Sequence, residues 1–104
     1  MTPASPLNTY VILRRGGWRS AEELQQAAAK SGDVGDNEMS DDIRWIRSYV
    51  VAESDGLLGT VCVYLASSPE KIREHAERAG IPAHDVIPVV DTLVVRPDPE
   101  LVAA

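Results

Sequence analysis

The sequence predicts a single α+β domain with four strands and two helices in the order β-α-β-β-α-β. Three observations support this class. Aliphatic and aromatic residues gather in four short runs, two stretches with helical periodicity begin at serine caps, and glycine or proline separates the runs. The length of 104 residues is typical of one hydrophobic core.

The first run predicts a strand, and the stretch after it predicts a helix. Residues 9–14 are mostly β-branched or aliphatic, and a pair of glycines ends the run. Ser20 followed by Glu23 forms a capping box, in which the serine side chain accepts from the third helical N–H. We therefore expect a helix that begins after Ser20 and continues to about Lys30.

The middle of the chain predicts a loop and a β-hairpin. Residues 32–42 are polar and acidic without a period, so we expect a solvated loop there. Residues 43–51 and 60–66 are rich in β-branched and aromatic side chains, which is typical of strands. Asp55 and Gly56 lie between them and form a common hairpin-turn dipeptide.

The last part of the chain predicts the second helix and the fourth strand. Ser68 is a favourable N-cap residue, and Pro69 takes the first helical position, where proline is tolerated. The helix over residues 70–79 ends at Gly80, which suits the left-handed position after a helix. A β-branched run then predicts a strand over residues 86–95.

This order of elements defines the ferredoxin-like arrangement, with two helices on one face of a four-stranded antiparallel sheet. The predicted ferredoxin-like domain covers residues 9–95. Residues 1–8 and 96–104 contain prolines and few strand-forming residues, so we expect flexible tails there.

Alternation along the strands predicts which side chains lie on the face without helices. We expect that face to be aromatic and apolar, with Tyr10, Ile12, Ile43, Trp45, Arg47, Tyr49, Val51, Cys62, Tyr64 and Ala66. The face under the helices would then receive the alternate set, which is Ile46, Ser48, Val50, Val61, Val63 and Leu65. An apolar patch of that size usually marks an interface, so the sequence predicts a homodimer packed sheet to sheet.

Composition and charge exclude several classes of function. Sixteen acidic residues oppose ten Lys and Arg, and this net charge of −6 argues against a nucleic-acid partner. No run approaches the roughly 20 apolar residues that a membrane helix needs. The N-terminus lacks the basic and apolar segments of a secretory signal, so we expect a cytoplasmic protein with no membrane partner. Arg14, Arg15 and Arg19 form the only local basic cluster.

Cys62, His75 and His84 are the candidate metal ligands, because thiolate and imidazole groups bind nickel, zinc and copper. Their spacing matches no compact metal motif. Each also has a structural interpretation. Cys62 can act as a small buried hydrophobe, His75 as a hydrogen-bonded imidazole beside the core, and His84 as an exposed loop residue.

Trp45, Arg47, Tyr49 and Tyr64 are the candidate ligand-binding residues. Aromatic walls with one arginine suit a planar or anionic small molecule, although the same side chains could fill a dimer interface. The sequence holds no nucleophile elbow and no glycine-rich phosphate loop, so we assign no catalytic residue.

Four segments, residues 43–50, 62–66, 72–76 and 80–83, resemble a family of small bacterial ferredoxin-like domains of unknown function, one branch of which is nickel-binding and nickel-responsive. The resemblance spans about residues 9–92. It implies a dimeric ferredoxin-like fold, nickel sites at the surface and a role in nickel sequestration.

The chain departs from this family at two positions. Members often have histidine where this chain has Arg47, and glutamate where it has Leu65. A guanidinium at the first position would repel a metal ion.

Two functions follow. The first is a cytosolic, non-catalytic homodimer that binds nickel through His75, Cys62 and His84. The alternative is a small-molecule-binding protein, or a cofactor-free enzyme of the monooxygenase or isomerase type. It would use the face of Trp45, Arg47, Tyr49 and Tyr64, with His75 as acid or base. A protein-interaction subunit without a ligand is a third interpretation.

Overall fold

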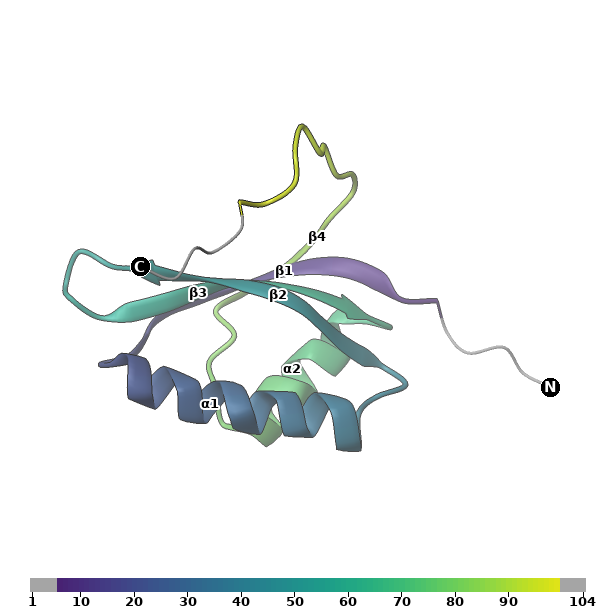
Figure 1. Cartoon of the computed structure of the whole chain (residues 1–104). Helices are drawn as coiled ribbons and strands as arrows, with labels where there is room; N and C mark the ends of the chain where they lie inside the picture. Colours follow the sequence, from purple (N-terminus) through teal and green to yellow (C-terminus); the bar gives the residue numbers. More distant parts are fainter. Residues whose placement is uncertain (1–5, 100–104) are drawn as a thin grey trace.

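The computed structural model describes residues 6–99 and contains a four-stranded antiparallel sheet with two helices on one face (Figure 1). The strand order is β2-β3-β1-β4, which is the ferredoxin-like α+β fold that the sequence predicts. The elements are β1 (Asn8–Trp18), α1 (Ala21–Asp33), the π-helical turn η1 (Val34–Glu38), β2 (Ile43–Ala52), β3 (Leu58–Ala66), α2 (Pro69–Ala79) and β4 (Asp85–Pro88). The outer parts of the two predicted tails, residues 1–5 and 100–104, lie outside the described residues.

Both helices begin at the predicted serine caps, and α2 also ends at its predicted glycine. The Ser20 hydroxyl accepts a hydrogen bond from the Glu23 backbone N–H at 3.2 Å, and Ser68 accepts one from Lys71 at 3.3 Å. Gly80 ends α2 at a φ of 70°, a left-handed conformation that other residues adopt at a cost. Within residues 6–99, neither helix has the length and apolar character needed to cross a membrane.

The predicted loop over residues 32–42 is instead packed against the domain, so that prediction is wrong. Helix α1 continues to Asp33 and passes into η1. Val34 and Met39 are buried in the core, and a side chain at Gly35 would contact Ile43. The acidic residues that dominate this stretch face water, while two apolar side chains are enough to hold the turn against the core.

The fourth strand is shorter than predicted. β4 ends at Pro88, whereas the β-branched run predicted a strand over residues 86–95. The register explains the difference, because Tyr10 pairs with Pro88 and β1 begins only two residues earlier, at Asn8. Val89 still donates a hydrogen bond to the Thr9 carbonyl at 3.0 Å, and the chain then leaves the sheet on the side opposite the helices (Figure 1).

The predicted assignment of faces is wrong for the two central strands, β1 and β3. Their helix-covered face carries the buried core residues Tyr10, Ile12, Cys62, Tyr64 and Ala66. The open face instead carries Val11, Leu13, Val61, Val63 and Leu65, all of them half-buried. Both faces of these strands are apolar, so the alternation is correct but does not indicate which set lies under the helices.

A β-bulge divides the predicted ligand-binding residues between the two faces. The register of β2 against β3 shifts between Trp45 and Arg47, which places one extra residue in β2. Trp45 therefore pairs with Tyr64 on the helix-covered face, while Arg47 and Tyr49 lie on the open face. The expectation that these four side chains share one face is wrong.

Gly59 provides a test of the close packing between β1 and β3. A Cβ atom at this position would lie 2.6 Å from the Arg14 carbonyl oxygen and 3.1 Å from Glu53 Oε2. We expect Gly59→Ala to lower the free energy of unfolding by about 1–3 kcal/mol, because backbone must move. Chemical denaturation measures this loss.

Gly32→Ala is the matched control. Gly32 lies in α1, and a Cβ there would make an ordinary 3.9 Å contact with the Trp45 ring. This substitution should stabilise the protein by up to about 1 kcal/mol, because alanine favours helix more than glycine does. Equal effects of the two substitutions would contradict the close approach at Gly59.

Candidate functional site

A cluster of polar side chains lies between the helices and the sheet. Arg14 extends from β1, Tyr64 from β3, Ser31 from α1 and His75 from α2. All four are buried, and Arg14 and His75 are each only 1% exposed. Buried polar groups are costly unless they find partners, so their contacts determine what the site can do.

Ser31 connects both helices to the sheet. Its hydroxyl lies 3.2 Å from the Tyr64 hydroxyl, and its backbone carbonyl lies 3.0 Å from His75 Nε2. Because a carbonyl oxygen only accepts, His75 Nε2 is the donor, and in the neutral imidazole the lone pair is then on Nδ1. Nδ1 is buried and has no hydrogen-bond partner among the described residues.

Burial controls the protonation of His75. Desolvation lowers the pKa of His75 below its ordinary value of 6.5; the hydrogen bond that His75 donates to the Ser31 carbonyl opposes this shift, and the positive charge of Arg14 adds to it. The imidazole is therefore uncharged at neutral pH. The Tyr64 hydroxyl stays protonated, because burial raises the pKa of this phenol above 10.

Arg14 has no charged partner among residues 6–99. Its guanidinium carbon lies 5.7 Å from the centre of the Tyr64 ring, in a cation–π contact. Nη1 and Nη2 are buried and make no hydrogen bond to any residue in the described range 6–99. The sequence placed Arg14 in one basic cluster with Arg15 and Arg19, but those two are exposed and pair with Glu53 and Glu23.

Only the alternation of side chains along β1 could have indicated from the sequence that Arg14 is buried. Tyr10, Ile12 and Arg14 occupy alternate positions of β1 and therefore share one face. Once that face is known to be the buried one, Arg14 must be buried as well. Sequence analysis assigned Tyr10 and Ile12 to the open face and so missed Arg14 as a site residue.

A cavity of about 80 Å³ adjoins Arg14 between α1 and the sheet. Tyr64 and Trp45 line one wall with their rings stacked, 6.1 Å apart between centres. The remaining lining residues are mostly apolar and come from β1, α1, β2, β3 and the segment after α2: Trp18, Leu24, Ala27, Ala28, Ser31, Ser48, Val50, Thr60, Cys62 and Ile81.

The three predicted metal ligands lie in different surroundings. Cys62 is buried on the helix-covered face, where its sulfur accepts from Ser48 at 2.9 Å and donates to Thr60 at 3.3 Å. Sequence analysis placed Cys62 on the opposite face from His75, but both point into the space between helices and sheet. His84 is exposed, and its Nδ1 accepts a hydrogen bond from the Arg15 backbone N–H at 2.9 Å.

The structure does not gather these three residues into one centre. Within residues 6–99, no three His, Cys, Asp or Glu side chains come close enough together to hold a metal ion. At His84 the Nδ1 lone pair is already used, so the neutral ring carries its proton on Nε2. His75 Nδ1 is therefore the one imidazole lone pair of the described chain that no other group uses.

Arg47 and Tyr49 bind the segment that follows β4. Both side chains contact the Asp98 carboxylate, Arg47 through an ion pair and Tyr49 through a hydrogen bond of 2.8 Å. Asp98 belongs to the predicted C-terminal tail, so this part of the tail is attached to the open face. These contacts occupy the polar groups that were expected to bind a small molecule.

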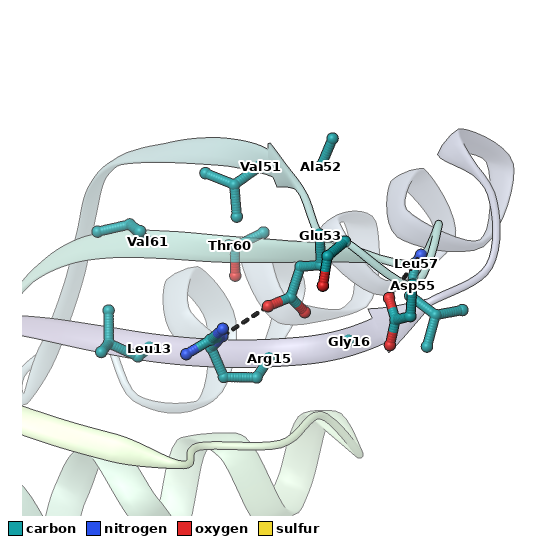
Figure 2. Close-up of a pocket in the computed structure, with 11 residues that line it drawn as sticks. Leu13, Arg15, Gly16, Val51, Ala52, Glu53, Asp55, Leu57, Thr60 and Val61 are labelled. Carbon is teal, nitrogen blue, oxygen red and sulfur yellow. Dashed lines mark hydrogen bonds and ion pairs between the residues drawn. The ribbon is translucent and has the colours of Figure 1, made fainter.

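A wide groove of about 740 Å³ opens where the β2–β3 hairpin meets the end of β1 (Figure 2). Arg15 and Glu53 face each other across it, 2.6 Å apart. These two charges neutralise each other, and the Asp55 carboxylate, which also lines the groove, accepts a hydrogen bond from the Leu57 backbone N–H at 3.0 Å.

The buried imidazole predicts how stability depends on pH. His75 has a lowered pKa in the folded protein, so the unfolded chain takes up a proton first as the pH falls. The free energy of unfolding should therefore fall below pH 6.5, by at most about 1.4 kcal/mol per pH unit from this group. His75→Gln should flatten that dependence in denaturation curves between pH 7.5 and 5.

Gln25→Ala is the control for this measurement. Gln25 is an exposed residue of α1 without an ionisable group, so its removal should leave the slope of stability against pH as in the unsubstituted protein. A slope that His75→Gln leaves unchanged, or that Gln25→Ala flattens equally, would contradict the assignment.

Comparison with known proteins agrees with this fold. The crystal structure of SCO4226 from Streptomyces coelicolor A3(2) superposes with a TM-score of 0.67 at 20% identity, covering 82% of this chain and 99% of that one. No curated protein matches the sequence. A family described as nickel responsive protein SCO4226-like matches residues 10–89, which include nearly the whole sheet and both helices. The chain therefore belongs to the family of SCO4226-like nickel responsive proteins.

Proposed function

We propose that this protein is a cytosolic, non-catalytic nickel-binding protein that sequesters Ni²⁺. The family name supports a role connected with nickel. The free lone pair on His75 Nδ1 is the observation that carries the proposal for this chain. Metal ions bind the neutral form of imidazole, and burial keeps His75 in that form at neutral pH.

Cys62 is the second proposed ligand. It points from β3 into the layer between the sheet and the helices, which also holds the buried His75 of α2, and nickel accepts thiolate together with imidazole. Because no third His, Cys, Asp or Glu of residues 6–99 joins them, water would complete the coordination. His84 is the weakest of the three candidates, because a metal at its ring would compete with the Arg15 hydrogen bond.

Titration of metal-free protein with Ni²⁺ in a calorimeter tests this function. We expect micromolar binding by the unsubstituted protein and an affinity at least tenfold lower in His75→Ala, because a nitrogen ligand is lost. His84→Ala serves as the comparison and should lower the affinity less than His75→Ala does, because a metal at the His84 ring would compete with the Arg15 hydrogen bond. Binding absent below millimolar Ni²⁺, or unaffected by His75→Ala, would refute the proposal.

We further propose that the protein acts as a homodimer in which the open faces of two sheets pack together. The open face is apolar along both central strands, from Val11 and Leu13 to Val61, Val63 and Leu65. Such a surface is typical of an interface rather than of a face in water.

The segment after β4 supports a second copy of this chain as the partner. Val90 is 98% exposed, and Leu93, Val94 and Val95 are each at least 75% exposed. This segment projects above the open face, away from the helices (Figure 1). Burying each of these side chains against a partner would contribute about 1.5–3 kcal/mol.

Light scattering coupled to size exclusion tests the dimer. The unsubstituted chain should elute with twice the mass of one chain, and Val63→Asp should elute as a monomer because it buries a charge at the centre of the interface. The control, Gln25→Asp, lies on the exposed surface of α1 and should remain dimeric. A monomeric unsubstituted chain would contradict this arrangement.

A further inference from the structure

The buried charge of Arg14 needs a counterion that the described chain does not supply. A guanidinium stays protonated at all physiological pH values. Arg14 is 1% exposed, and no carboxylate within residues 6–99 lies in ion-pair distance of it. An uncompensated buried charge strongly destabilises the folded protein. We therefore infer that this charge serves to bind an anion and does not serve the packing of the domain.

The neighbours of Arg14 are all neutral. Tyr64 offers its ring face, and Ser31 and Thr60 offer only hydroxyl groups nearby. His75 is uncharged at neutral pH. Two donors, Nη1 and Nη2, have no partner in the described range, and their fork geometry matches a carboxylate. Both nitrogens are sealed from water, so an anion reaches them only after neighbouring side chains of the cavity wall move aside.

The cavity beside Arg14 restricts the size of that anion. Its volume is about 80 Å³. At roughly 10–15 Å³ for each water-sized position, this corresponds to about five to eight such positions. The walls are largely apolar, with Ala27 and Ala28 of α1 leaving room opposite the Trp45 ring. A polyvalent anion such as phosphate would find too few donors there.

We propose that this cavity binds a small aliphatic monocarboxylate, with its carboxylate on the Arg14 guanidinium and its hydrocarbon part against α1 and Trp45. This site differs in its chemistry from the proposed nickel site, since the Arg14 guanidinium binds the carboxylate and no metal ion takes part. It lies on the helix-covered face, so it does not depend on the proposed dimer.

Intrinsic fluorescence tests the site in the unsubstituted protein. Both tryptophans of the chain, Trp18 and Trp45, line the cavity. We expect titration of metal-free protein with sodium butyrate to change the tryptophan emission along a saturating curve. Butyramide has nearly the same shape without the charge, and it should give no saturating change. No response to butyrate, or an equal response to butyramide or to sodium chloride, would overturn the proposal.

Two neighbouring arginines provide matched variants for a thermal measurement. Butyrate at about ten times its Kd should raise the melting temperature of the unsubstituted protein by roughly 5 °C or more. Arg14→Met should abolish that rise, because it removes the buried charge while keeping a similar volume. Arg15→Met removes an exposed arginine one residue away and should retain the rise.

The comparison of these variants is decisive in both directions. If butyrate stabilises Arg14→Met as much as the unsubstituted protein, Arg14 does not bind the carboxylate and the proposal fails. If Arg14→Met does not fold, the fluorescence titration of the unsubstituted protein decides the question. Because neither experiment includes nickel, failure here leaves the proposed nickel function standing, and failure of nickel binding leaves this site standing.

Discussion

The hydrogen-bonded cluster around Ser31 is the interaction on which the arrangement of the domain depends. Tyr64 reaches Ser31 from the sheet, and His75 reaches it from α2. A buried polar group loses its hydration on folding and must recover a partner within the protein. Both helices are thereby held at one position over β3, because neither can slide without leaving a buried hydroxyl or imidazole unpaired.

The same cluster gives the two faces of the sheet different properties. The helix-covered face contains the uncharged imidazole of His75, the thiol of Cys62 and the charge of Arg14 beside a small cavity. The open face is aliphatic on β1 and β3, and its polar groups on β2 are engaged by Asp98. The proposed ligand sites therefore lie under the helices, and the proposed association surface is the open face.

The β-bulge in β2 maintains this division. One extra residue between Trp45 and Arg47 changes which alternate side chains of β2 point to each face of the sheet. Trp45 can then stack on Tyr64 inside the domain while Arg47 pairs with Asp98 outside it. Without the bulge, a continuous alternation would place Trp45 and Arg47 on the same face, and a second guanidinium would enter the layer that already holds Arg14.

Local sequence signals determined the order and most boundaries of the elements. The serine caps, the glycine after α2 and the Asp-Gly turn act through neighbouring residues, so they are readable without knowledge of the rest of the chain. Only the tertiary structure decided which apolar set of β1 and β3 lies under the helices, because both sets are apolar and period-two alternation is symmetric between faces. The burial of Arg14, the separation of Trp45 from Arg47 and the end of β4 at Pro88 all follow from contacts between strands distant in sequence, which no local pattern encodes.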